Sequence, residues 1–262
     1  MTTSDFQSQW AEWHQEIEAR RRSPQGFLAV TGLYWLDIEP ISIPGAPGRW
    51  ALGENGPVVE LDDDEHLVLG GDARRGRVDF GTFDGRHPVR ARYGATEIEI
   101  ARRGTTYIVR PRQADHQLLA DYEGTPSYPP SPLWALTGEF LAREFPLEIE
   151  VGSTVDGLSS SYTSSGVVEF EVNGSTFRLT AFDDDDGLTF LFGDETSGTT
   201  TYPGGRELET RRPDAHGFVR LDFNRATNLP CAYTSFTTCP LPPPENRLAL
   251  AVEAGEQIPA RH

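Results

Sequence analysis

The chain has 262 residues, 37% of them hydrophobic, which is enough for a folded core and disfavours general disorder. Its formal net charge of −17 repels polyanions at long range, so nucleic acid and anionic membrane surfaces are unfavourable partners. All 23 basic residues are Arg, which either a GC-rich genome or adaptation to high salt would explain.

The sequence also bears on targeting and on disulfides. No run of about 18 apolar residues is present, which disfavours a transmembrane helix. Residues 1–9 are polar and lack the basic and apolar segments of a secretory signal. Two Cys are too few for a disulfide scaffold. We therefore expect a soluble, cytoplasmic protein.

The first predicted element is an amphipathic helix near the N-terminus. Phe6, Trp10, Trp13 and Ile17 recur at the spacing of one helical stripe. Pro24 follows and would end the helix. The two Trp side chains are expected to pack the helix onto a sheet. The next apolar stretch, residues 27–36, is predicted to be either a strand or a short helical turn.

Short β-strands are predicted along the rest of the chain. In residues 97–100, Glu and Ile alternate, which places both Ile on one face of a strand. No alternation of strands and helices is present, so we predict an all-β, mainly antiparallel sandwich or barrel-like fold with the N-terminal helix packed on it. The predicted strands are Arg49–Leu52, Val58–Leu61, His66–Leu69, Arg77–Phe80, Val89–Tyr93, Glu97–Arg102, Thr105–Arg110, Leu147–Val151, Val167–Val172, Thr176–Phe182, Leu188–Phe192, Gly217–Phe223 and Arg247–Glu253.

Domain organisation has two readings. The chain forms one β-rich domain over residues 1–262, or two β halves, 1–125 and 137–262, joined by a Pro-rich loop at 126–132. Two hairpin turns are predicted in the second half, at residues 173–174 and 186–187. The four consecutive Asp residues 183–186 then form a charged hairpin tip, because the spacing of a calcium-binding loop is not met.

Many catalytic devices are absent from the sequence. No GxSxG, HExxH, CxxC or GxGxxG pattern occurs in a suitable context, and without Lys no Schiff base can form. The six His are scattered singly, so we predict no metal site. His87 is the most plausible general base among them, although a turn residue before a strand is the simpler interpretation.

The unusual segment runs from Thr201 to Glu256, where aromatic, amide, acidic and Arg side chains stand among Gly and Pro. Tyr202 and Arg206 flank a Pro-Gly-Gly turn that would let a ligand approach the backbone. Arg206 could then bind a carboxylate or phosphate through two hydrogen bonds. The alternative is that Arg206 pairs with a structural acid.

Asp222, Asn224 and Asn228 lie around the end of a predicted strand. Buried polar groups need hydrogen-bond partners, and the wall of a site would supply them. The alternative is that both Asn side chains bond to the local backbone in a turn.

Cys231 and Cys239 are eight residues apart, and three readings stay open. They form a disulfide, which a reducing cytoplasm opposes. They act as metal ligands or reactive thiols, or they are packed as free thiols.

The segment DFNRATNLPCAYTSFTTCPLPPPENRL, with TYPGGREL before it and EAGE after it, closely resembles the C-terminal signature of an uncharacterised prokaryotic family, domain of unknown function sixteen-eighty-four. The segment GFLAVTGLYWL and the loop ending in YPPSP are similar too. The resemblance implies no known activity. It implies that the family's motif includes Tyr202, Arg206, Asp222, Asn224, Asn228, Cys231, Cys239, Glu245 and Asn246.

The resulting functional prediction is a small-molecule enzyme, with a hydrolase as the candidate class, acting on a polar or anionic substrate in a pocket built by this cluster. Asp222 and Glu245 are the predicted catalytic acids, and the predicted substrate-binding residues are Tyr202, Arg206, Asn224, Asn228 and Asn246. The sequence specifies no cofactor and no oligomeric state. A non-catalytic binding module and a purely structural loop cluster are the alternatives.

Overall fold

The computed structural model describes residues 3–85 and 87–260, which divide into two compact units. Unit 1 comprises the described parts of Met1–Glu18 and Glu123–Arg261, and unit 2 comprises Ala19–Tyr122. Helix α1 (Thr3–Arg21) therefore begins in unit 1 and ends in unit 2. The two units are described separately below.

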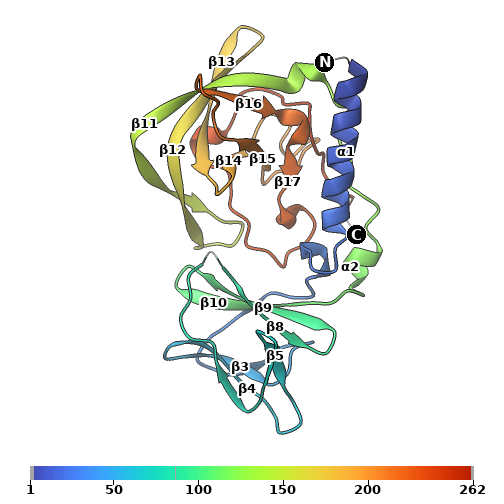
Figure 1. Cartoon of the computed structure of the whole chain (residues 1–262), viewed down its shortest axis with the longest axis vertical. Coiled ribbons are helices and arrows are strands. Elements are labelled where there is room, and N and C mark those ends of the chain that lie inside the picture. The colour runs from blue at the N-terminus through green and yellow to red at the C-terminus, as the bar shows by residue number, and fades with distance from the viewer. Residues whose placement is uncertain (1–2, 86, 261–262) are drawn as a thin grey trace. The chain divides into compact units, whose positions relative to one another are not determined.

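Unit 2 contains two antiparallel sheets (Figure 1). One has the strand order β1-β10-β9-β8-β5-β6 and the other the order β2-β3-β4-β7. Buried side chains of both sheets, including Trp50 and Ile100, form one hydrophobic cluster. The elements are η1 (Phe27–Ala29), β1 (Tyr34–Trp35), β2 (Ile41–Ser42), β3 (Arg49–Gly53), β4 (Gly56–Glu60), β5 (Leu67–Leu69), β6 (Asp72–Arg74), β7 (Arg77–Asp79), β8 (Val89–Tyr93), β9 (Thr96–Arg103), β10 (Thr106–Arg112) and α2 (Gln117–Ala120).

Unit 1 contains one seven-stranded sheet with the order β16-β11-β12-β13-β14-β15-β17. Figure 1 shows that β11 and β12 are long and strongly curved. The elements that follow α1 are η2 (Pro132–Trp134), β11 (Ala135–Gly152), β12 (Ser159–Val172), β13 (Ser175–Asp183), β14 (Gly187–Phe192), β15 (Arg206–Arg211), β16 (Phe218–Asp222), η3 (Phe223–Arg225), β17 (Thr227–Asn228), η4 (Pro230–Ala232) and η5 (Pro244–Asn246).

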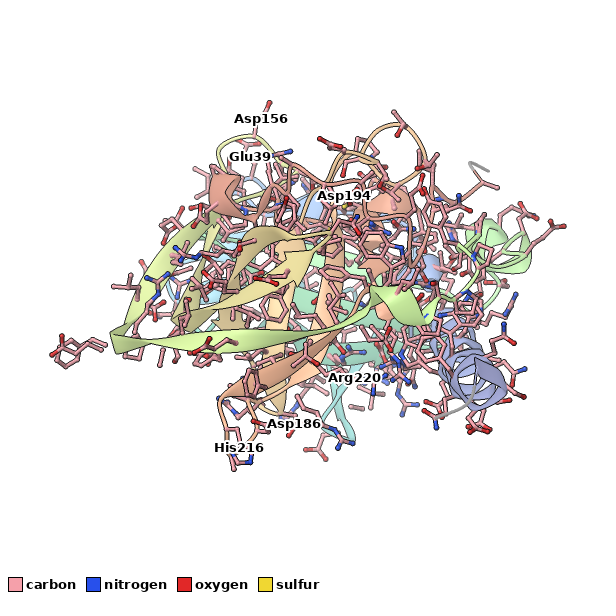
Figure 2. The ribbon with its side chains drawn as sticks, turned by 90° about the horizontal axis from the view of Figure 1, so that it is seen from above. Glu39, Asp156, Asp186, Asp194, His216 and Arg220 are labelled. Carbon is pink, nitrogen blue, oxygen red and sulfur yellow. The ribbon has the colours of Figure 1, made fainter. Side chains whose placement is uncertain are left out.

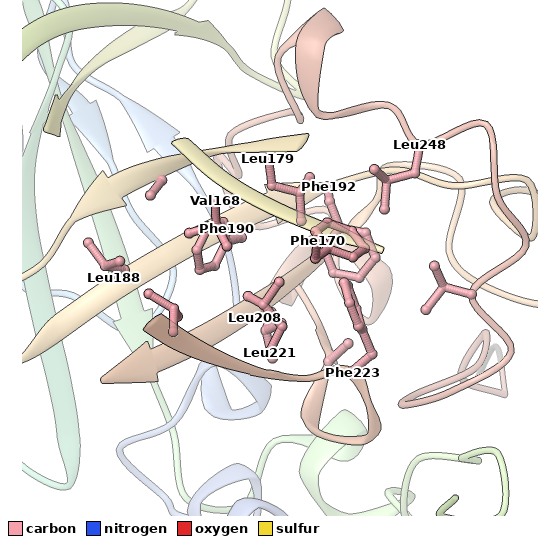
Figure 3. Close-up of a cluster of buried hydrophobic side chains, with 14 of the residues drawn as sticks. Val168, Phe170, Leu179, Leu188, Phe190, Phe192, Leu208, Leu221, Phe223 and Leu248 are labelled. Atoms are coloured by element: carbon pink, nitrogen blue, oxygen red, sulfur yellow. The ribbon is translucent and has the colours of Figure 1, made fainter. Parts of the chain in front are cut away.

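The main core of unit 1 lies on one face of this sheet. Alternate residues of each strand point into it, as the two-residue period of a strand requires. Phe170, Phe192 and Phe223 pack there with their ring centroids 5.4–5.6 Å apart between neighbours (Figure 3). The opposite face carries a smaller buried cluster of Val151, Phe182, Leu191, Leu229 and Cys239, here called the outer cluster.

Helix α1 joins unit 1 through its Trp residues, as predicted. The indole nitrogen of Trp10 donates a hydrogen bond of 2.9 Å to the carbonyl oxygen of Asn224. The guanidinium of Arg225 lies 5.5 Å from the centroid of the Trp13 ring. Phe6 is buried. Among the described residues, no helix is both long and apolar enough to span a membrane.

The predicted fold class is confirmed, since every pairing between named strands is antiparallel and the sheets of the described chain do not close into a barrel. Residues 27–36 contain both predicted forms, a 3-10 turn and a short strand. The turn at Asn173-Gly174 is also confirmed, with φ of 51° and 78°. In the second predicted turn, at residues 186–187, Gly187 instead lies within β14. A Cβ atom added at Gly187 would lie 2.0 Å from the carbonyl oxygen of Thr210.

The predicted strand Arg247–Glu253 is wrong. Only Arg247 forms an isolated bridge, to Gly193, and no strand follows. The physical reason is that the backbone of this segment bonds partly to residues 193–195, which form no strand, and partly to side chains. The amide of Val252 donates to the Asp194 carboxylate, and the carbonyl of Val252 accepts from Arg206. Strand β15 lies in a segment for which no strand was predicted.

Candidate functional site

Arg206, the predicted anion-binding residue, is enclosed by the protein itself. Its side chain is 1% exposed, and one terminal nitrogen lies 2.9 Å from the equally buried carboxylate of Asp194, which is labelled in Figure 2. The terminal nitrogens also donate to the carbonyl oxygens of Val252, Ala254 and Glu256. Burial lowers the pKa of Arg206, and the charge of Asp194 opposes that effect. The arrangement is a structural clamp on the C-terminal segment.

The glycines before Arg206 also serve packing. Gly205 has a φ of 86°, and a Cβ there would lie 2.4 Å from Pro242 and 2.7 Å from the carbonyl oxygen of Phe192. Gly205 therefore lets other atoms of the protein pack closely against the backbone. The prediction was that the turn lets a ligand approach the backbone.

Asn228 lies directly opposite Arg206 in the pairing of β15 with β17. Its backbone amide donates to the buried Glu256 carboxylate at 2.6 Å, and its side-chain amide donates to the carbonyl oxygen of Gln257 at 2.7 Å. Arg206 and Asn228 are thus brought together, and both hold the same C-terminal segment.

Asp222 and Asn224 form a second, separate group. The Asn224 side chain donates to the Asp222 carboxylate at 2.8 Å and to the carbonyl oxygen of Ser131 at 2.9 Å, and it accepts from the Ser131 amide. Arg220 and Arg225 lie 3.8 and 3.6 Å from the same carboxylate. This group ties the segment before β11 to the end of β16.

Asn246 is fully buried and completes the sheet. Strands β13 and β14 pair at Phe182 with Thr189, so continued pairing in this register would bring Thr180 opposite Leu191, two positions further on. There the Asn246 amide intervenes, accepting from the Thr180 amide at 2.7 Å and donating to the carbonyl oxygens of Thr180 and Leu191. Where β13 and β14 separate, the side-chain amide of Asn246 provides hydrogen bonds that a peptide group of a neighbouring strand would otherwise provide. The adjacent Glu245 is exposed.

Tyr202 and the two Cys form a further group. The Tyr202 hydroxyl donates to the carbonyl oxygen of Cys231 at 3.1 Å. The backbone amide of Cys231 donates to the sulfur of Cys239 at 3.1 Å, and no disulfide joins the two Cys. The hydrogen bond with Cys239 and burial raise the pKa of Cys231. Cys239 belongs to the outer cluster, and Cys231 packs against it.

Glu207 is a candidate that the sequence interpretation did not select. It faces Leu191 of β14 and Thr227 of β17 across the sheet, so its side chain lies on the face that carries the outer cluster. Burial raises the pKa of Glu207 to about 7, and the charges of Glu209 and Cys239 add to that effect. Within the described chain, no hydrogen bond or ion pair reaches its half-buried carboxylate.

A signal for Glu207 was present in the sequence. Within the run Arg206-Glu207-Leu208-Glu209, the last three residues alternate polar, apolar and polar, so a strand there would have placed Glu207 on the face opposite to Leu208. The other titratable candidate, His87, is exposed in a turn, where its amide donates to Asp84 at 3.1 Å. In the part of the chain that is described, no three His, Cys, Asp or Glu side chains are placed to hold a metal ion.

Fold and site together define a mainly antiparallel β protein whose C-terminal motif is built into its sheet. A match to a known protein family identifies the family of this protein. Residues 120–257, a little more than half of the chain, match the family described as Protein of unknown function (DUF1684), and the chain belongs to this family. The predicted family resemblance is therefore confirmed.

Two other comparisons were made. No protein with a curated description matches the chain. Among solved structures, the chain is similar to an uncharacterized protein from Haloarcula marismortui, whose solution NMR structure has a TM-score of 0.45 and 32% sequence identity. The match covers 53% of this chain and 78% of that chain.

Proposed function

We propose that this protein is a small-molecule hydrolase whose acid–base group is Glu207. The observation that supports this proposal is a half-buried carboxyl whose pKa is raised to about 7 and that has no internal partner in the described chain. A group with a pKa near the working pH is present in both protonation states, which suits proton transfer in both directions. Structural carboxylates such as Asp194 are instead fully paired.

The chemistry follows from this carboxyl group. As a carboxylate, Glu207 accepts a proton from water, whose oxygen then attacks the electrophilic centre of the substrate. As a carboxylic acid, Glu207 returns the proton to the leaving group. Cys239 interacts electrostatically with Glu207. The sulfur of Cys239 accepts a hydrogen bond from the backbone amide of Cys231, and the carbonyl oxygen of Cys231 accepts one from the Tyr202 hydroxyl. These contacts support a place for Tyr202, a predicted binding residue, beside the substrate.

The charges near Glu207 limit the kinds of substrate that this site would accept. Glu209 and Asp184 act on Glu207 with negative charge, while the positive charge of Arg206 is buried and paired with Asp194. An anionic substrate would be repelled at this position, so the proposal favours a polar substrate that is neutral or cationic. The remaining predicted residues, Asp222, Asn224, Asn228, Glu245 and Asn246, are not needed for this reaction. A direct role for them in the site stays a prediction.

Hydrolysis of chromogenic substrates tests the proposal. The panel comprises neutral nitrophenyl esters and glycosides, cationic aminoacyl nitroanilides and anionic nitrophenyl phosphates, each measured between pH 5 and 9. For the substrate that is turned over, Glu207→Gln is expected to lower the rate by about 100-fold or more. The matched control is Glu209→Gln, which removes an exposed carboxylate from the same face of β15. Its rate should stay within about 3-fold of that of the unmodified protein.

Two outcomes would decide against hydrolysis. A Glu207→Gln protein as active as the unmodified chain overturns the role of this carboxyl. If no compound is hydrolysed, but one binds and loses its affinity in Glu207→Gln, the non-catalytic binding module is the better description.

A further inference from the structure

The two thiols lie in a segment that is otherwise fixed on both sides. The carbonyl oxygen of Cys231 accepts from Tyr202, and the carbonyl oxygen of Cys239 accepts from the amide of Thr154 at 2.9 Å. The amide of Leu241 donates to the carbonyl oxygen of Gly152 at 2.7 Å. The backbone around each Cys is therefore positioned by unit 1, and the two sulfurs do not depend on a flexible loop to meet.

The distances place the sulfurs within bonding reach. The Cys239 sulfur is 3.1 Å from the backbone nitrogen of Cys231, so it lies within about 4.6 Å of the Cys231 Cα. In a disulfide the two Cβ atoms lie about 3.5–4.5 Å apart, and the Cys239 sulfur already contacts the backbone that carries the Cys231 side chain.

The two thiols differ in access. Cys239 is 5% exposed, whereas Cys231 is half-buried. A reagent from solvent therefore reaches Cys231 first, and the sulfur that can act second is already beside it. Metal binding explains the pair less well, because among the described side chains no third ligand joins them.

We propose that Cys231 and Cys239 are a redox-active dithiol, which a low-molecular-weight disulfide converts into an intramolecular disulfide. In the first step, the Cys231 thiol, whose raised pKa keeps it protonated at neutral pH, loses its proton to solvent at alkaline pH and its sulfur attacks the reagent. A mixed disulfide forms, and one reagent thiolate leaves. In the second step, the Cys239 thiol loses its proton and its sulfur attacks the Cys231 sulfur, releasing the second reagent thiolate. The reagent disulfide gains two electrons, and the protein dithiol loses them.

The disulfide would cross-link residues 229–239, the segment that covers the outer cluster. Leu229 and Cys239 of this cluster lie at the two ends of that segment. Oxidation would also remove the Cys239 thiol, which interacts electrostatically with Glu207. The proposed oxidation does not depend on the hydrolase proposal, because thiol chemistry and not turnover reports it.

Reaction with oxidised glutathione tests the inference on the full chain. The expected product is a monomer two hydrogens lighter by mass spectrometry, with both free thiols lost and a peptide linking Cys231 to Cys239. In Cys239→Ser, the reaction should stop at a stable glutathione adduct on Cys231. In Cys231→Ser, the remaining buried thiol should react at least about 10-fold more slowly than Cys231 does. Cys231→Ser/Cys239→Ser is the control that should not change.

Closure of the mixed disulfide should also be at least about 10-fold faster in the native protein than in urea, because the fold holds the two sulfurs together. The inference is overturned if the native protein keeps both thiols, accumulates glutathione adducts without closing, or forms only disulfide-linked dimers. Equal reactivity of the two single variants would overturn the assigned order of attack.

Discussion

Replacing Arg206 with Leu is expected to lower the free energy of unfolding by about 3–5 kcal/mol, because the change leaves the Asp194 carboxylate buried without its charge partner. The carbonyl oxygens of Val252, Ala254 and Glu256 lose their donors at the same time. Urea unfolding followed by Trp fluorescence measures the difference.

A matched control lies on the same strand. Arg211→Leu changes an exposed Arg of β15 and should shift the free energy by no more than about 0.5 kcal/mol. In the double variant Arg206→Leu/Asp194→Leu, both charges of this pair are removed together, so its loss should be clearly smaller than the sum of the two single losses. A loss below about 1 kcal/mol in Arg206→Leu would contradict the clamp.

Stability is expected to fall as the pH rises from 4.5 to 7, and Glu207 is the cause. Its pKa is raised from the ordinary 4.5 to about 7 in the folded protein. Between these values the folded state binds more protons than the unfolded state, so deprotonation favours unfolding. The contribution is fully present below pH 4.5, is lost through pH 7, and amounts to about 3 kcal/mol.

Glu207→Gln isolates this effect, because Gln cannot ionise. At pH 4 the variant and the unmodified protein should be about equally stable. At pH 8 the variant should be more stable by up to about 3 kcal/mol, as expected when a functional carboxyl is kept at the expense of stability. Glu209→Gln removes one of the charges that raise the pKa of Glu207, so it should leave the stability at pH 4 unchanged and move the loss of stability to lower pH. Parallel stability curves for the unmodified protein and Glu207→Gln across this pH range would show that Glu207 titrates normally.

The sequence predicts much of the fold because local patterns suffice for it. The stripe of Phe6, Trp10 and Trp13 identifies α1, and strict alternation identifies strands such as β8, whose bounds Val89–Tyr93 agree with the prediction. The hairpin at Asn173 depends only on two adjacent residues. Each of these signals is contained in a few neighbouring positions.

The roles of the C-terminal polar residues are decided by contacts far along the chain. Arg206 looks like an anion-binding residue in sequence, but its partners Asp194 and Val252 lie 12 and 46 residues away. Asn246 resembles a ligand-binding amide, but it fills a gap between β13 and β14 that no local pattern reveals. Glu207 was passed over because the Pro-Gly-Gly before it suggested a loop, whereas pairing with β14 makes it part of a strand.

The inserted amide of Asn246 has a consequence for the order in which unit 1 assembles. Asn246 completes a sheet whose strands are synthesised earlier. Arg206 forms hydrogen bonds with carbonyl groups that follow Asn246 in the chain. During synthesis on the ribosome, the nascent sheet therefore carries an open seam, and Arg206 lacks its carbonyl partners, until residues 246–256 emerge. Such distant closing contacts favour slow folding of this unit.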